Sequence, residues 1–294
     1  MVTTSNTGAA VVAVDGTEDG HRALVYAATD LVARGDLSLR LVHVPRGAPA
    51  LAPYVQPGKI REIGESLLQE AAKQAQDAGV DPARITTVLT DTPRTSAVLD
   101  HLEDARYLVL GTRASAVQHF LAGTTSLWLV AQSPVPVHCV PRTWQESRSH
   151  SGRVVVGVDG SRTDRIVLTE AFAEAAARGA SLEVVHAWRP VSPYDAAITG
   201  RVLLDEWEKK TRDALTKPIE EVAAANAGVD WHLRLEYQRV PAALYEASLN
   251  ADLLVLGRHG SHAPVAVMVG SNTRTLLRNA TCPVVAVPVR STQE

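Results

Sequence analysis

Residues 11–17 of the chain read VVAVDGT, and residues 155–161 read VVGVDGS, which is nearly the same stretch again. Further short segments follow each of these two stretches in the same order, among them YLVLG at 107–111 and LLVLG at 253–257. Solenoid repeats have periods of ~20–50 residues, far shorter than this spacing. The 294 residues are therefore predicted to form two copies of one domain, which agrees with a prior of ~150 residues per domain.

Within each copy, short apolar runs rich in β-branched residues alternate with alanine-rich stretches of helical spacing, such as 20–34 and 60–78. The runs are typical of buried strands. The expected strands cover residues 11–15, 39–44, 85–89, 107–111 and 135–140, and then 154–159, 182–187, 231–236, 253–257 and 284–289. Strands without polar alternation, separated by helices, form parallel sheets covered on both faces. We predict an α/β fold of two tandem doubly wound domains, each with a five-stranded parallel sheet.

The predicted domains are residues 1–146 and 147–294, and the stretch 142–153, rich in Ser, Arg and Gln, is the expected linker. The final strand of each domain is apolar and lies at a sheet edge in this topology. Exposed apolar edges are usually paired or covered. We therefore expect the two domains to pair within one chain, and a further homodimer stays open.

Composition excludes several classes of protein. Hydrophobic residues make up 46% and charged residues 21%, and the net charge of −3 lacks the basic excess of a nucleic-acid-binding protein. No window approaches the ~18 apolar residues of a membrane span, and residues 1–10 lack the pattern of a signal peptide. Cys139 and Cys282 lie in Val-rich runs, where buried free thiols are expected. A cytoplasmic protein without membrane or nucleic-acid partners is the expectation.

Ligands of doubly wound sheets bind beyond the carboxyl ends of the strands, where the strand order reverses. The residues at these strand ends are Asp15, Val44 and Gly111 in the first copy and Asp159, Ala187 and Gly257 in the second. The sequence GRHGSHA at 257–263 and GSNT at 270–273 then combines glycines with a helix start. Glycines allow close backbone approach, and helix N-termini attract anions. The pattern favours a phosphate-binding loop. The alternative is that these glycines and polar residues only end a strand and begin a helix.

Other nucleotide-binding motifs do not fit. The chain contains no G-x-x-x-x-G-K-[S/T] sequence and no G-x-G-x-x-G after a strand. The spacing Gly257-x2-Gly260-x9-Gly270-Ser271, with ADLLVLG at 251–257 and TCPVVAV at 281–287, instead resembles the universal stress protein family. The resemblance covers nearly the whole chain and implies a Rossmann-like fold of the adenine nucleotide alpha hydrolase type. In this family the glycine pattern marks members that bind ATP.

The resemblance also implies roles for individual residues of the second copy. Asp159 and the backbone near Ala187 would hold the adenine or ribose of ATP, and Gly157 would allow close backbone approach. The phosphates would be held by Gly257, Arg258, His259, Gly260, Ser261, His262, Ala263, Gly270, Ser271 and Asn272. ATP is the expected cofactor, and no motif of the chain encodes a site for an accompanying Mg²⁺.

The first copy departs from the pattern. It keeps the residues Asp15, Gly111, Gly123, Thr124 and Thr125. Ala114, however, stands where the second copy has Gly260, and the loop that follows is one residue shorter. A methyl group at position 114 obstructs a phosphate or forbids a positive φ. We therefore predict weaker or absent ATP binding in the first domain.

Four histidines near the predicted sites have alternative roles. His43 and His186 follow the second strand of each copy and either line the site or lie hydrogen-bonded near the core. His259 and His262 are not expected to bind a metal, because zinc takes three or four protein ligands and no further His or Cys cluster accompanies them.

The sequence offers no convincing general base for an attacking water and no G-x-S-x-G elbow. The leading hypothesis is a regulatory ATP-binding protein of the stress response, which presents a different surface to an unknown protein partner when the nucleotide is bound. One alternative is a slow ATP hydrolase. The other is a partner-binding module that holds no nucleotide.

Overall fold

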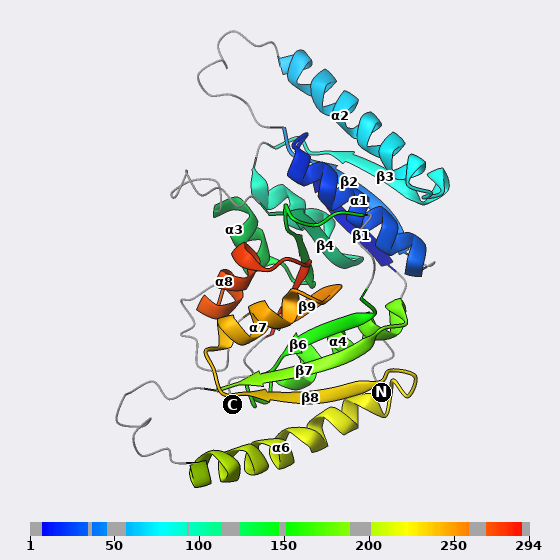
Figure 1. Cartoon of the computed structure of the whole chain (residues 1–294). Helices are drawn as coiled ribbons and strands as arrows, with labels where there is room; N and C mark the ends of the chain where they lie inside the picture. The colour runs from blue at the N-terminus through cyan, green and yellow to red at the C-terminus, as the bar shows by residue number, and fades with distance from the viewer. Residues whose placement is uncertain are drawn as a thin grey trace. The chain divides into compact units, whose positions relative to one another are not determined.

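The computed structural model describes residues 8–34, 37–45, 57–92, 94–112, 124–146, 151–188, 201–258 and 269–289. The chain divides into two compact units, Met1–Arg148 and Ser149–Glu294. Each unit holds helices and a parallel sheet (Figure 1).

The strands of the first unit are β1 (Gly8–Val14), β2 (Leu37–His43), β3 (Ile85–Leu89), β4 (Ala105–Gly111) and β5 (Val137–Val140). Its helices are α1 (Glu18–Arg34), α2 (Pro57–Asp77) and α3 (Thr124–Gln132), with 3-10 turns η1 (Pro82–Arg84) and η2 (Thr95–His101). The strand order is β3-β2-β1-β4-β5, and all four pairings are parallel. The order therefore reverses between β1 and β4.

The second unit repeats this arrangement with β6 (Arg153–Gly157), β7 (Ser181–Ala187), β8 (Trp231–Glu236), β9 (Leu253–Gly257) and β10 (Val284–Val287). Its helices are α4 (Asp164–Arg178), α6 (Arg201–Ala223), α7 (Val240–Ser248) and α8 (Ser271–Asn279). The parallel order β10-β9-β6-β7-β8 reverses between β6 and β9. The predicted α/β class with two doubly wound sheets is confirmed.

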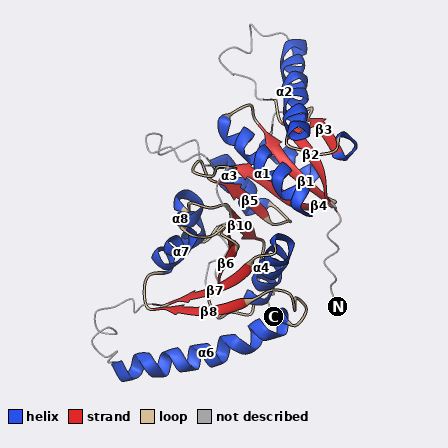
Figure 2. Cartoon of the chain, turned by 45° about the vertical axis from the view of Figure 1, so that its right-hand side comes forward, coloured by secondary structure: helices blue, strands red, loops and turns tan. Residues whose placement is uncertain are grey.

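Helices cover both faces of the second sheet. α4 packs against α6 and over β6 and β9, and α7 packs against α8 on the other face (Figure 2). The strand residues Val154, Val156 and Val184 are fully buried beneath α4, whose Phe172 is equally inaccessible. Right-handed crossovers explain the arrangement, because connections that run in opposite directions along the sheet must lie on opposite faces.

One charged group lies inside the second sheet. Glu183 of β7 accepts hydrogen bonds from Arg153 Nη1 of β6 at 3.1 Å and from Arg234 Nη1 of β8 at 3.0 Å, and its side chain is 3% exposed. Burial alone raises the pKa of Glu183, but the two arginines outweigh burial and hold this pKa below its ordinary value. The carboxylate therefore stays ionised between three strands.

Both cysteines are buried free thiols, as predicted. Burial raises the pKa of Cys139 to about 12, so its reactive thiolate form is suppressed. Among the described helices, none combines the length and the apolar character that crossing a bilayer requires.

Candidate functional site

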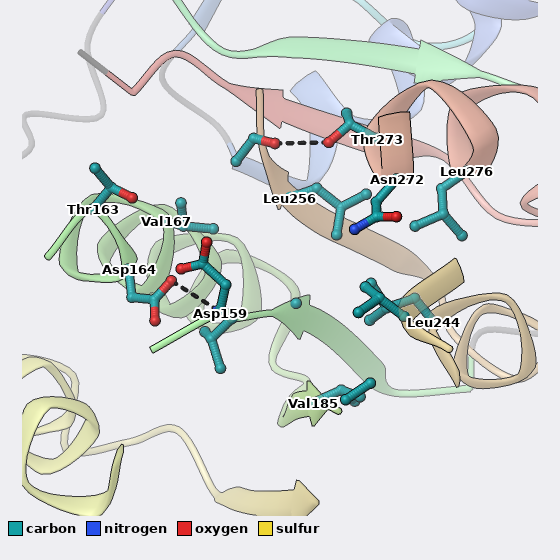
Figure 3. A pocket seen from close by; sticks show the side chains of 15 residues that line it. Asp159, Thr163, Asp164, Val167, Val185, Leu244, Leu256, Asn272, Thr273 and Leu276 are labelled. Atoms are coloured by element: carbon teal, nitrogen blue, oxygen red, sulfur yellow. Dashed lines mark hydrogen bonds between the residues drawn. The ribbon is translucent and has the colours of Figure 1, made fainter. Parts of the chain in front are cut away.

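A pocket opens in the second unit at the carboxyl ends of β6 and β9, where the strand order reverses (Figure 3). Its polar lining includes Asp159, Asp164 and Asn272, and Gly157 and Gly257 supply open backbone. The described walls enclose about 100 Å³. Sites for drug-sized ligands usually enclose ~300–1,000 Å³, so these walls accommodate part of such a ligand.

Two carboxylates meet at one side of the pocket. The backbone N–H of Asp159 donates to Asp164 Oδ1 at 3.2 Å, and the N–H of Gly160 donates to Asp164 Oδ2 at 2.7 Å. Asp164 is only 7% exposed. Burial, followed by the nearby charge of Asp159, raises the pKa of Asp164 to about 7. Asp164 therefore fixes the turn that carries the exposed Asp159 (Figure 3).

The predicted end of one strand is wrong at this turn. The strand expected at 154–159 ends at Gly157. Val158 still donates its N–H to the Val185 carbonyl, but the amides of Asp159 and Gly160 turn to Asp164 instead of a neighbouring strand. Asp159 consequently lies beyond the sheet, at the mouth of the pocket.

The opposite side of the pocket is the start of α8. Gly270 is its N-cap residue, and the amides of Ser271, Asn272 and Thr273 begin a helix, where no carbonyl of a preceding turn can accept from them. Thr273 Oγ1 donates to the Gly257 carbonyl at 2.9 Å, which ties this helix start to the end of β9 (Figure 3). The Gly270 N–H donates to the Arg258 carbonyl at 2.9 Å. The helix dipole therefore presents partial positive charge to the pocket.

The remaining wall is apolar. It consists of Val185, Val240, Leu244, Leu256 and Leu276, with Val167 from α4. These leucines pack closely on Gly157, since a Cβ there would lie 2.8 Å from Leu256 Cδ2 and 3.0 Å from Leu244 Cδ1.

The equivalent strand ends of the first unit differ. A Cβ on Gly111 would lie 2.2 Å from the Asp19 carbonyl oxygen, so the first turn of α1 closes directly against the end of β4. Asp15 Oδ1 accepts from Thr17 N at 3.1 Å, just as Asp159 Oδ1 accepts from Ser161 N at 3.1 Å, but Asp15 Oδ1 also accepts from Thr17 Oγ1 at 2.6 Å. Gly20 occupies the position of Asp164, so no side chain can hold the turn in the same way.

Several predicted site residues thus meet in one place. The pocket of the second unit is lined by Gly157, Asp159, Ala187, Gly257 and Asn272. Arg258, Gly270 and Ser271 are their direct neighbours in the chain. Six predicted residues lie outside the described residues: His259, Gly260, Ser261, His262, Ala263 and Gly123. In the first unit, Val44 follows β2 and Thr124 begins α3.

His43 of β2 and His186 of β7 are each hydrogen-bonded to a backbone carbonyl. His43 Nδ1–H donates to the Val14 carbonyl at 2.7 Å, and His186 Nδ1–H donates to the Val158 carbonyl at 3.0 Å. Burial lowers the pKa of His186, which is therefore neutral at neutral pH. Within the described residues, no three His, Cys, Asp or Glu side chains gather as metal ligands would.

The pocket residues that sequence reasoning missed include Thr163, Asp164 and Leu244. The sequence does contain a signal for Asp164. The two copies differ at this position, where the first copy has Gly20 and the second has a carboxylate. The contribution of α7 through Leu244 depends on which face that helix covers, and local sequence does not reveal this.

The sequence pattern of the universal stress protein family matches residues 8–141 and again residues 150–288. The chain belongs to this family. A universal stress protein of Mycobacterium tuberculosis is 29% identical over 304 residues, which cover 95% of this chain and 94% of that protein. For a relative from Mycolicibacterium smegmatis the identity is 28%, with 99% and 100% covered.

The solved structures agree on the fold. A universal stress protein of Archaeoglobus fulgidus matches with a TM-score of 0.69 at 19% identity, covering 97% of this chain and 98% of that one. The resemblance to universal stress proteins seen in the sequence is confirmed, and so is the Rossmann-like fold that it implied.

Proposed function

We propose that the second unit binds an adenine nucleotide, with ATP as the principal ligand, and that the chain is a nucleotide-dependent regulator in the cytoplasm. One observation carries the proposal. A carboxylate (Asp159), the strand-end residues Ala187 and Gly257, and the start of α8 (Asn272) surround one pocket at the reversal of strand order. This is the place where doubly wound sheets bind ligands.

The residues present fit such a ligand. Asp159 can accept a hydrogen bond from a ribose hydroxyl or an adenine amine, and the apolar wall around Leu244 and Leu256 suits a purine ring. The unshared amides of Ser271 and Asn272 suit a phosphate. We assign the rest of the phosphate contacts to the loop residues 258–263. A bound Mg²⁺ would be held mainly by phosphate oxygens and water.

We further propose that the first unit binds nucleotide weakly or not at all. The contact between Gly111 and the Asp19 backbone supports this, because it fills the space beside the end of β4. The alanine at position 114 and the shorter loop add to the argument.

Regulation then follows from differential binding. ATP stabilises the conformations of the second unit in which Asp159 and the start of α8 both contact it, and a protein partner reads the resulting surface. A slow ATP hydrolase and a module that holds no nucleotide are the competing functions.

Matched variants of the two units test the proposal. In calorimetric and thermal-shift titrations with ATP, Asp159→Asn should weaken binding by the full chain about tenfold, the worth of one charge-assisted hydrogen bond. Asp15→Asn, the same change in the first unit, should leave the affinity unchanged. Absence of both ATP binding and nucleotide released on denaturation would favour the partner-binding module. Steady ADP production that Gly260→Ala abolishes would favour the hydrolase.

A further inference from the structure

The second unit contains another, larger cavity between α4 and α6. It measures about 530 Å³ and has an apolar floor of Leu168, Leu215 and Ile219. α4 and α6 cover one face of the sheet, whereas α7 and α8 of the proposed nucleotide pocket cover the other (Figure 2). The two cavities share only Val158 and Asp164 as a common wall. The volume lies within the ~300–1,000 Å³ that is usual for small-molecule sites.

The first unit has the same groove in a narrower form. Between α1 and α2 the cavity measures about 310 Å³. There Leu67 Cδ2 reaches to 2.9 Å from the place that a Cβ on Gly16 would take. In the second unit Ala214 stands in the corresponding helix position, and nothing lies within 4 Å of the equivalent place on Gly160. The exchange of leucine for alanine therefore opens the second groove.

The charge around the groove also changes sign. In the first unit the lining includes the acids Glu18 and Glu70, and His21 Nδ1–H donates to Gln74 Oε1 at 2.8 Å across the groove. The second unit has Arg162 in place of Glu18 and Arg165 in place of His21, and Lys210 lies on the α6 side.

These cations are only partly neutralised. Arg165 lies 3.5 Å from Glu221, with both side chains largely exposed. Within the part of the chain that the structure describes, Arg162 and Lys210 form no ion pair. Two exposed cations thus lie at the rim of an apolar cavity.

One aromatic ring lines the cavity, with two indoles beyond it. His186 lines it and, because its Nδ1–H donates to Val158, it offers Nε2 as an acceptor. The His186 ring lies 6.1 Å from that of Trp207, and Trp188 stacks on Trp207 at 4.8 Å. An indole next to the cavity also provides a fluorescent reporter.

We propose that this cavity is a second small-molecule site, which takes an amphiphilic anion with an apolar or aromatic body and a carboxylate, sulfonate or phosphate head. The body lies on Leu168, Leu215 and Ile219, and the head lies between Arg162 and Lys210. Burial of the body supplies most of the affinity, and the two cations orient the head. The proposal does not depend on nucleotide binding, because the residues that carry it lie on the other face of the sheet.

The test uses 8-anilinonaphthalene-1-sulfonate as a probe, since it combines aromatic rings with an anionic head. With the full chain, we expect saturable dye fluorescence excited by energy transfer from tryptophan. Ala214→Leu refills the groove as Leu67 does in the first unit, and it should weaken dye binding at least tenfold. Arg162→Glu, an exposed rim substitution, should weaken it several-fold with a smaller dependence on salt.

The matched control is Leu67→Ala, which enlarges the acidic groove of the first unit and should add no dye site. Far-UV circular dichroism and urea midpoints verify that each variant is folded. The proposal is overturned if the parent shows no saturable binding, if Ala214→Leu binds as the parent does, or if Leu67→Ala creates the stronger site. Dye that ATP displaces while folded Ala214→Leu leaves its affinity unchanged would lie in the nucleotide pocket, which also overturns it. Failure of ATP to bind would contradict the proposed function alone.

Discussion

Replacing the buried carboxylate of the second unit, Asp164→Asn, should change how the stability of the protein depends on pH. The carboxylate has a pKa of about 7 in the folded protein, against 3.8 for an unperturbed aspartate. Between these values the folded protein keeps a proton that the unfolded chain has released. The contribution of Asp164 to stability is therefore fully present below pH 4 and is lost as the pH rises to 7.

The size of the effect follows from the displacement of the pKa. One pKa unit corresponds to about 1.4 kcal/mol, so the parent loses about 2 kcal/mol between pH 5 and pH 7 through this group, whose folded form is half-ionised at pH 7. The asparagine side chain of the variant cannot ionise and avoids that loss. Its single oxygen, however, accepts only one of the two amides of Asp159 and Gly160, which costs about 1–3 kcal/mol at every pH. The variant should be less stable than the parent at pH 5 and about equal or more stable at pH 8.

Urea unfolding at pH 5, 6, 7 and 8, followed by circular dichroism and tryptophan fluorescence, measures this difference. The decisive quantity is the free energy of unfolding of the variant minus that of the parent, because other titrating groups cancel in it. Asp213→Asn, an exposed substitution on α6, is the control and should change stability by less than about 0.5 kcal/mol throughout. Parallel pH curves for Asp164→Asn and the parent would refute the assigned environment of Asp164.

Three further predictions test the packing. Gly111→Ala should destabilise the first unit by about 2–4 kcal/mol in urea unfolding, since the new Cβ meets the Asp19 backbone, which cannot move away cheaply; an unchanged midpoint would contradict this contact. Glu183→Ala should cost about 1–3 kcal/mol at pH 7, because two partly exposed arginines lose their shared carboxylate while Arg234 keeps Glu236, and the cost should shrink in acid, where the glutamate itself becomes protonated. Cys139 should react with a thiol reagent such as DTNB only on unfolding, and rapid labelling of the native protein at pH 8 would show that the thiol is not buried.

Most of the fold could be predicted because its central strands are buried on both faces. The expected strand at 253–257 coincides with the covered strand β9. The strands expected at 85–89 and 231–236 also coincide with β3 and β8, although these end strands are only partly buried and contain polar residues. In a covered parallel sheet nearly every strand residue is apolar, so each run is recognisable without knowing its neighbours. The order of alternating helices and strands then determines the layers.

The site could be predicted only in part, for a physical reason. Asp159 and Gly257 follow buried strands, so their place at the carboxyl edge can be derived from the strands alone. Asp164 acts through hydrogen bonds to the turn before it, and Leu244 acts through the packing of α7. Such roles depend on backbone direction and helix orientation, which apolar periodicity does not specify.

The two repeats separate what the fold requires from what each unit does. Strand runs such as 107–111 and 253–257 are nearly interchangeable, because a side chain buried between two helical layers has little freedom to vary. The exchanges that change chemistry lie at the carboxyl edge and on the helices beside it: glycine to Asp164, leucine to Ala214 and glutamate to Arg162. The first places an ionisable group under the proposed nucleotide pocket, and the other two open the second cavity and reverse its charge. Because all three act in the second unit and none alters its sheet, binding can diverge between the repeats while both keep the same fold.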